Sequence, residues 1–88
     1  MDMKLWNFVE RASGIKNKIF YIENYYMEQD SVDGMEYHFL EINVEDADSE
    51  TYEASYKVEA NTKERVETQA DFVLSEYFPE DAEIIKNY

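Results

Sequence analysis

Residues 35–60, MEYHFLEINVEDADSETYEASYKVEA, contain two runs of alternating apolar residues separated by the polar segment EDADSE. Alternation with a period of two is typical of β-strands that cover a core with one face and meet water with the other. The stretch therefore predicts two strands, over 35–45 and 51–60, joined by a short acidic connection. The side chains expected on the inner face of the second strand are Tyr52, Ala54, Tyr56, Val58 and Ala60.

The first of these strands changes its alternation between Phe39 and Leu40. A β-bulge moves all later side chains to the opposite face, so we expect a bulge at this point. Upstream, Asp33 and Gly34 predict a hairpin of type I′, because that turn needs positive φ. The preceding run, residues 15–28, is rich in Ile, Phe and Tyr and predicts a strand that is covered in part on both faces.

Helices are expected on either side of the strands. Apolar residues recur with helical spacing over residues 2–13, which predicts an amphipathic helix that ends at Gly14. The capping pattern NTKE predicts a second helix over 61–78. Pro79 and the acids after it suit the first turn of a last short helix over 79–85.

The expected element order is thus α-β-β-β-α-α. An antiparallel meander whose helices pack on one face buries the apolar stripes of both, so we predict an α+β fold with a three-stranded antiparallel β-meander. The chain of 88 residues is expected to form a single domain over 1–88.

The charge of the chain narrows its possible partners. Asp and Glu number 21 against 8 Lys and Arg, for a formal net charge of -13. Such a surface repels nucleic acid and anionic membranes and attracts basic proteins, so we predict a basic protein partner and no direct binding of nucleic acid or membrane. The absence of Cys, of a long apolar run and of a signal-peptide pattern predicts a cytoplasmic protein without disulfides.

A metal site in the acidic connection is not expected. Asp46, Asp48 and Glu50 have the spacing that opens an EF-hand loop. However, Thr51 stands where that loop needs glycine, and Lys57 where it needs a bidentate glutamate.

Catalysis is not expected either. His38 is the one histidine of the chain, and there is no Cys for it to activate and no second His to share a metal. We therefore predict a protein that is not an enzyme and that needs no cofactor.

Acids without neighbouring bases are the strongest functional feature. Residues 28–59 hold eleven acids and one base, Lys57, and the second helix carries a further acidic stripe. Repulsion among these carboxylates lowers the stability of the fold, so we expect a fold that keeps them to use their negative charge. Tyrosines favour interfaces, and we expect Tyr25, Tyr26 and Tyr52 to act as surface anchors. The predicted partner-binding residues are Glu41, Glu45, Asp46, Asp48, Glu50, Tyr52, Glu53, Glu64, Glu67 and Asp71.

In size, acidity and tyrosine content the chain resembles the small phage-encoded DNA mimics, the anti-CRISPR and anti-restriction proteins. The element order also resembles that of a small Cas9-inhibiting anti-CRISPR. This resemblance implies an inhibitor in the bacterial cytoplasm whose carboxylates take the place of phosphates in the Lys and Arg groove of a nucleic-acid enzyme. The order is similar to that of the double-stranded RNA-binding domain too, but the acidic helix excludes RNA binding by its sign.

Two further functions stay open. An immunity protein or antitoxin that neutralises a basic toxin would use the same acidity without mimicry. An acidic subunit or chaperone of a larger assembly is the third possibility. The sequence does not predict an oligomeric state.

Overall fold

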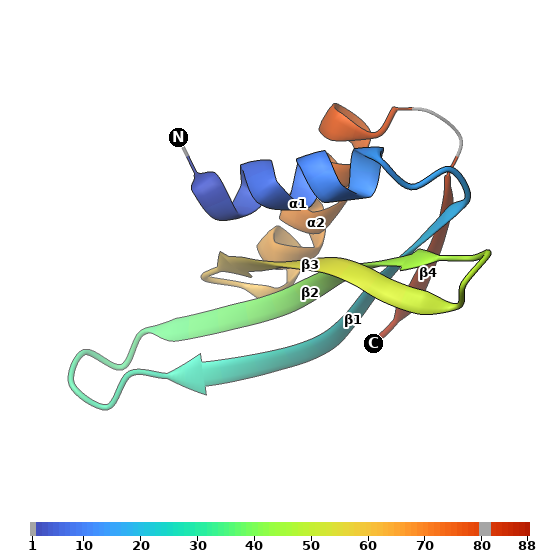
Figure 1. The fold of residues 1–88 in the computed structure, drawn as a ribbon. Coiled ribbons are helices and arrows are strands. Elements are labelled where there is room, and N and C mark those ends of the chain that lie inside the picture. Colours follow the sequence, from blue (N-terminus) through green and yellow to red (C-terminus); the bar gives the residue numbers. More distant parts are fainter. Residues whose placement is uncertain (1, 80–81) are drawn as a thin grey trace.

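A computed structural model of the protein describes residues 2–79 and 82–88. The elements are α1 (Met3–Ser13), β1 (Lys18–Gln29), β2 (Glu36–Asp46), β3 (Thr51–Ala60), α2 (Lys63–Tyr77) and β4 (Glu83–Asn87). The strands form one sheet in the order β3-β2-β1-β4, and both helices lie on the same face of it (Figure 1). The predicted α+β class is confirmed, and the predicted meander is present as β1, β2 and β3.

The prediction of a last helix over 79–85 is wrong, because residues 83–87 form the strand β4. This strand pairs with β1 in parallel, from Ile19 opposite Glu83 to Glu23 opposite Asn87. So short an apolar run has no periodicity that separates helix from strand, and the free edge of β1 offers backbone hydrogen bonds that an isolated helical turn lacks. The expected first turn of that helix, at 80–81, lies outside the described residues.

The β1–β2 hairpin has a longer turn than predicted. Its strands end at Gln29 and Glu36, and the amide of Gly34 donates to the carbonyl of Asp30 at 2.9 Å. Only Gly34 has positive φ in this turn, at 73°, so the turn is not type I′. Figure 1 shows the hairpin extending well beyond the helices.

Replacing Gly34 with alanine should lower the free energy of unfolding by about 1 kcal/mol, because its φ of 73° is strained for a residue with a Cβ. Gly14 is the matched control: its φ is -79°, and an added Cβ would meet the Arg11 carbonyl at an ordinary 3.5 Å. Urea denaturation of the two variants measures the difference. Equal effects of both substitutions would contradict this explanation.

The predicted bulge between Phe39 and Leu40 of β2 is wrong. Side chains on the inner face of β2, toward the helices, are buried at every second residue without interruption. The bulge is in β1, where Asn24 and Tyr25 together oppose Leu40, and Asn24 adopts a positive φ of 58°. Phe39 belongs to the other face of the sheet, which explains the change of phase in the sequence.

A second bulge lies in β3. Ala54 pairs with Val44 and Tyr52 with Glu45, so that Glu53 is the extra residue. The bulge turns Tyr52 away from the inner face, where the alternation places it, and leaves its side chain 57 % exposed. The part of β3 after the bulge, residues 54–60, keeps the predicted alternation.

The core lies between the inner face of the sheet and the two helices. Asp2 caps α1 by accepting from the amides of Lys4 and Leu5, and Thr62, rather than Asn61, caps α2 by accepting from Arg65. The fully buried large side chains are Phe8, Phe20, Ile22, Leu40, Ile42, Val44 and Val66. Because both helices use this face, no element of residues 2–79 and 82–88 covers the opposite face of the sheet.

Candidate functional site

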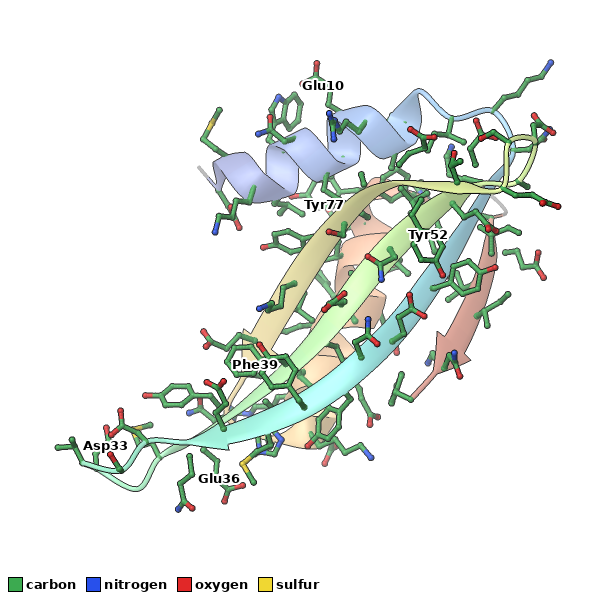
Figure 2. All side chains as sticks on the ribbon, turned by 60° about the horizontal axis from the view of Figure 1, so that its bottom comes forward. Glu10, Asp33, Glu36, Phe39, Tyr52 and Tyr77 are labelled. Carbon is green, nitrogen blue, oxygen red and sulfur yellow. The ribbon has the colours of Figure 1, made fainter. Side chains whose placement is uncertain are left out.

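We call the helix-free face of the sheet the open face. The strand registers place on it Ile19, Tyr21, Glu23, Tyr26 and Glu28 of β1, Tyr37, Phe39, Glu41, Asn43 and Glu45 of β2, Tyr52, Ser55, Lys57 and Glu59 of β3, and Glu83, Ile85 and Asn87 of β4. Figure 2 shows Phe39 and Tyr52 on this face, turned away from the helices. A sheet face this rich in aromatic side chains is a feature of interaction surfaces.

The middle of the open face holds three carboxylates, Glu23, Glu41 and Glu45, which we call the acidic centre. Glu23 and Glu41 are direct cross-strand partners. Like charges in that position repel and destabilise a sheet. The pairing therefore has a cost in stability that a purely structural surface would avoid.

Neutral donors orient the acidic centre without cancelling its charge. The Nδ2 of Asn43 donates to Glu23 at 2.7 Å, that of Asn24 to Glu41 at 3.1 Å, and the Tyr21 hydroxyl to Glu45 at 3.1 Å. Within residues 2–79 and 82–88, the ion pairs are His38–Glu36 and Lys86–Asp71, and neither includes a member of the acidic centre. Three negative charges are thus held in place, and the neighbouring cation Lys57, the cross-strand partner of Glu41, forms no ion pair with them.

Two aromatic pairs flank the acidic centre. Tyr26 and Phe39 stack with ring centroids 4.5 Å apart, and Lys57 lies 5.5 Å from each ring. Tyr21 and Tyr52 lie at the other side, with ring centroids 5.5 Å apart. Aromatic groups beside charges are the usual composition of a protein-binding hot spot.

The structure separates the predicted partner-binding residues into three places. Glu41, Glu45 and Tyr52 share the open face. Asp46, Asp48, Glu50 and Glu53 lie at or beside the β2–β3 turn, and Glu64, Glu67 and Asp71 lie on α2, on the other side of the sheet. No single flat surface can contact all of them.

The carboxylates of the β2–β3 turn are partly used by the fold. Asp46 accepts from the amide of Asp48 at 3.0 Å, and both oxygens of Asp48 accept from Asn17 at 3.0 and 3.1 Å. These bonds tie the turn to the segment before β1. Glu50, with a positive φ of 58°, completes the turn.

The acidic stripe of α2 is partly neutralised. Asp71 pairs with Lys86 of β4 at 3.3 Å, a contact that follows from the strand the sequence did not predict. Glu64 remains exposed, and Glu67 is half-buried near Tyr88, whose pKa is raised by burial and by this carboxylate.

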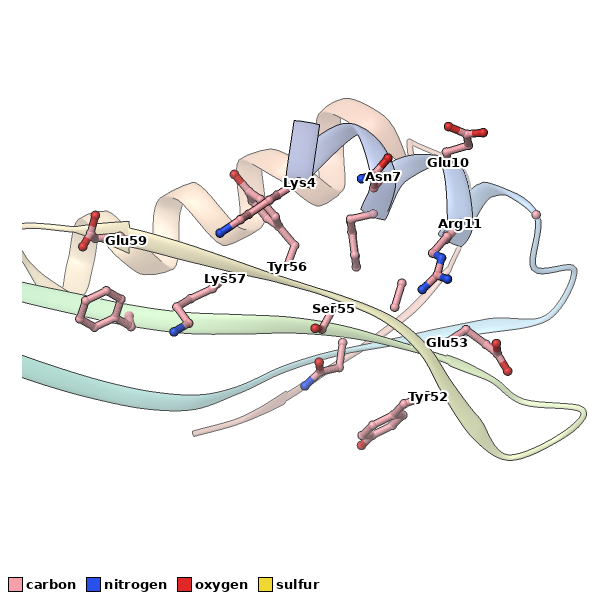
Figure 3. Close-up of a pocket in the computed structure, with 15 residues that line it drawn as sticks. Lys4, Asn7, Glu10, Arg11, Tyr52, Glu53, Ser55, Tyr56, Lys57 and Glu59 are labelled. Atoms are coloured by element: carbon pink, nitrogen blue, oxygen red, sulfur yellow. The ribbon is translucent and has the colours of Figure 1, made fainter. Parts of the chain in front are cut away.

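A shallow groove follows the free edge of β3 and is lined by residues of α1 on one side and of the open face on the other (Figure 3). Lys4, Asn7 and Arg11 of α1 border it, facing Glu53 and Glu59 of β3. Charged side chains and a bulge are common devices that keep an edge strand from pairing with other chains. The groove therefore has a structural explanation at the strand edge, and its other wall belongs to the open face through Phe39, Asn43 and Tyr52.

His38 belongs to the core side of the hairpin, buried to 8 % exposure. Its Nδ1 lies 2.6 Å from the Tyr25 hydroxyl and its Nε2 lies 3.3 Å from Glu36. Tyr25 also lies under the Nζ of Lys63, 5.0 Å from the ring centroid. Tyr25 is thus occupied within the fold, whereas Tyr26 and Tyr52, the other two predicted anchors, lie on the open face.

Tyr56 links the sheet to the start of α1 by donating to Asp2 at 2.6 Å. Burial and this bond raise the pKa of Tyr56 to about 12. A raised pKa means stability that is present below about pH 10, the unfolded value, and is lost as the pH rises toward 12. Tyr56→Phe should therefore lower the free energy of unfolding at pH 8 by at most about 1 kcal/mol.

The check is urea denaturation of both proteins between pH 8 and 12. The variant should lose less stability over pH 10 to 12 than the wild type. Parallel curves for the two proteins would contradict the assignment of this titration to Tyr56.

Sequence reasoning missed Glu23, Asn43 and Phe39 as parts of the site. The polar residues at 41, 43 and 45 alternate along β2, and this pattern could have identified one polar face. The assumed phase change at Phe39 obscured it. Glu23 could not be found, because only the register of β1 against β2 brings it beside Glu41.

Comparisons of the chain with protein-family models, curated proteins and solved structures found no match. Within the described part of the chain, no group of three or more His, Cys, Asp or Glu is arranged to hold a metal ion. No helix in residues 2–79 or 82–88 is long and apolar enough to cross a membrane.

Proposed function

We propose that this protein is an inhibitor that covers the basic nucleic-acid-binding groove of a nuclease or another DNA-binding defence protein. Its carboxylates would stand where phosphates stand. The observation that carries the proposal is the acidic centre: Glu23, Glu41 and Glu45 lie on a face without a covering element, and neutral donors orient them.

Three physical effects support this function. A net charge of -13 attracts a basic surface before contact and speeds association. Carboxylates already held by hydrogen bonds lose little conformational freedom on binding, so more of the electrostatic attraction remains as affinity. The flanking aromatic side chains would then contribute the contacts that slow dissociation.

An immunity protein or antitoxin directed at a basic toxin is the alternative. The aromatic pairs favour this alternative. Mimicry of phosphates requires only negative charges, so it does not explain the tyrosine and phenylalanine rings beside the acids. The two functions differ in one measurable respect. A mimic competes with DNA for its target, and an immunity protein that binds away from a nucleic-acid groove does not.

The test is capture from bacterial lysate at low salt, followed by elution with duplex DNA. A variant of the open face, Glu23→Gln, Glu41→Gln and Glu45→Gln together, is compared with a variant of α2, Glu64→Gln, Glu67→Gln and Glu76→Gln. Both variants remove three negative charges, so they differ only in position. We expect the wild type and the α2 variant to retain the same basic protein, DNA to release it, and the open-face variant to lose it.

Three outcomes would overturn the proposal or part of it. Loss of capture by the α2 variant alone would move the binding site to the helix layer. A captured partner that DNA does not release would favour the immunity protein. Equal loss of capture by both variants would mean that only the total charge matters, which would contradict binding through the open face.

A further inference from the structure

The pair formed by Tyr21 and Tyr52 has the composition of a cation-binding site. The rings lie 5.5 Å apart at an interplanar angle of 51°, and the Tyr21 hydroxyl donates to Glu45 at 3.1 Å. Carboxylates surround the pair: burial together with Glu23 and Glu45 raises the pKa of Tyr52, and the bond to Glu45, burial and Glu83 raise that of Tyr21. Rings with several nearby negative charges attract a cation through both the ring face and the carboxylates.

The other aromatic pair of the open face already contacts a cation from its own chain. The Nζ of Lys57 lies 5.5 Å from the ring centroids of both Tyr26 and Phe39 and 3.0 Å from the Tyr26 hydroxyl. The hydrogen bond to Tyr26 raises the pKa of Lys57, and the nearby carboxylates of Glu41 and Glu28 raise it further. This contact is an internal example of what an aromatic pair on this face does with a positive charge.

The Tyr21–Tyr52 pair differs from it in one respect. Among the described residues, the cations over aromatic rings are Lys18, Lys57 and Lys63, and none lies over Tyr21 or Tyr52. The side chain of Tyr52 is 57 % exposed, and the β3 bulge is what directs it to this face. The Tyr21–Tyr52 pair, which has more carboxylates around it, is therefore the aromatic pair that no cation of the described chain contacts.

We infer that the Tyr21–Tyr52 pair, with Glu23 and Glu45, receives an arginine side chain of the partner protein. This rests on the proposed function, in which the partner is basic. Arginine fits better than lysine, because its planar guanidinium stacks on a ring while its N–H groups reach carboxylates in the plane. Lysine offers a compact charge without a plane that stacks on the ring and without paired N–H groups for a carboxylate. The acidic centre then attracts the partner, and this pair fixes where one arginine goes.

The test uses two peptides, acetyl-hexaarginine amide and acetyl-hexalysine amide, at low salt, with binding followed by amide chemical shifts in NMR spectra. The wild type should prefer the arginine peptide, with the largest shifts at Tyr21, Tyr52 and Glu45. Tyr52→Leu should weaken the arginine peptide roughly fivefold and abolish the preference, since the ring contributes through cation–π contact. Tyr52→Phe should keep both the affinity for the arginine peptide and the preference for it over the lysine peptide, because it keeps the ring. Phe72→Leu on α2, where the side chain is 60 % exposed, is the control for loss of an exposed ring elsewhere.

The outcomes separate this inference from the proposed function. If Tyr52→Leu keeps both the affinity and the arginine preference, the inference is wrong, while peptide binding itself still agrees with an acidic binding face. If the wild type binds neither peptide at low salt, the open face does not attract basic chains, and the proposed function fails as well. Dispersed spectra of each variant show that it is folded.

Discussion

Replacing Glu41 with lysine should weaken binding to the proposed basic partner at least roughly hundredfold, because a positive charge at the middle of the open face would repel the positive charges of that partner. The fold should tolerate the change. Lysine at 41 would gain an opposite charge at Glu23 and a like charge at Lys57, its partners on the two neighbouring strands. These effects oppose each other, so the free energy of unfolding should stay within about 1 kcal/mol of the wild type.

Titration calorimetry with the purified partner and urea denaturation of the free variant measure the two quantities. Glu64→Lys, on the exposed start of α2, makes the same change of charge away from the open face and should weaken binding far less. If both lysine variants weaken binding equally, the effect comes from net charge, and the open face is not the contact surface.

Replacing Phe20 with alanine should lower the free energy of unfolding by about 3 to 5 kcal/mol. Phe20 is fully buried, and its ring lies 4.8 Å from that of Phe78 and 6.4 Å from that of Phe8. These rings join β1 to α1 and to the end of α2, so the cavity would open where the sheet and both helices meet. Such a loss is a large fraction of the stability of a small domain, about 5 to 15 kcal/mol.

Phe72→Ala is the matched control, because it removes the same side chain from an exposed position on α2. It should change the free energy of unfolding by no more than about 0.5 kcal/mol. Thermal and urea denaturation of both variants test the pair. Similar effects for Phe20 and Phe72 would contradict the described packing of the core.

The local features of this fold could be predicted from the sequence. Helix α1, the strands β1 to β3 and helix α2 follow from periodicity, capping residues and turn residues, and each was predicted to within a few residues of its bounds. Periodicity reports which side chains share a face of one element. It carries no information about which neighbour that element has.

Apart from the local differences in the hairpin turn and the α2 cap, the errors have one physical cause, which is pairing between distant segments. β4 forms because residues 83–87 find the free edge of β1, more than sixty positions earlier in the chain. The bulges at Asn24 and Glu53 exist only as misalignments between two strands, so no single strand reveals them. The second of them decides the exposure of Tyr52.

The candidate site divides in the same way. The sequence by itself determined that the chain is strongly acidic, that its acids outnumber its bases in and around the strands, and that most of its tyrosines lie on those strands. Only the tertiary structure decided which acids stand together, because Glu23 meets Glu41 through strand register and Glu64, Glu67 and Asp71 end up behind the sheet. Composition is a property of single residues, whereas a binding face requires distances between residues far apart in the chain, and packing of both helices on one side of the sheet sets those distances.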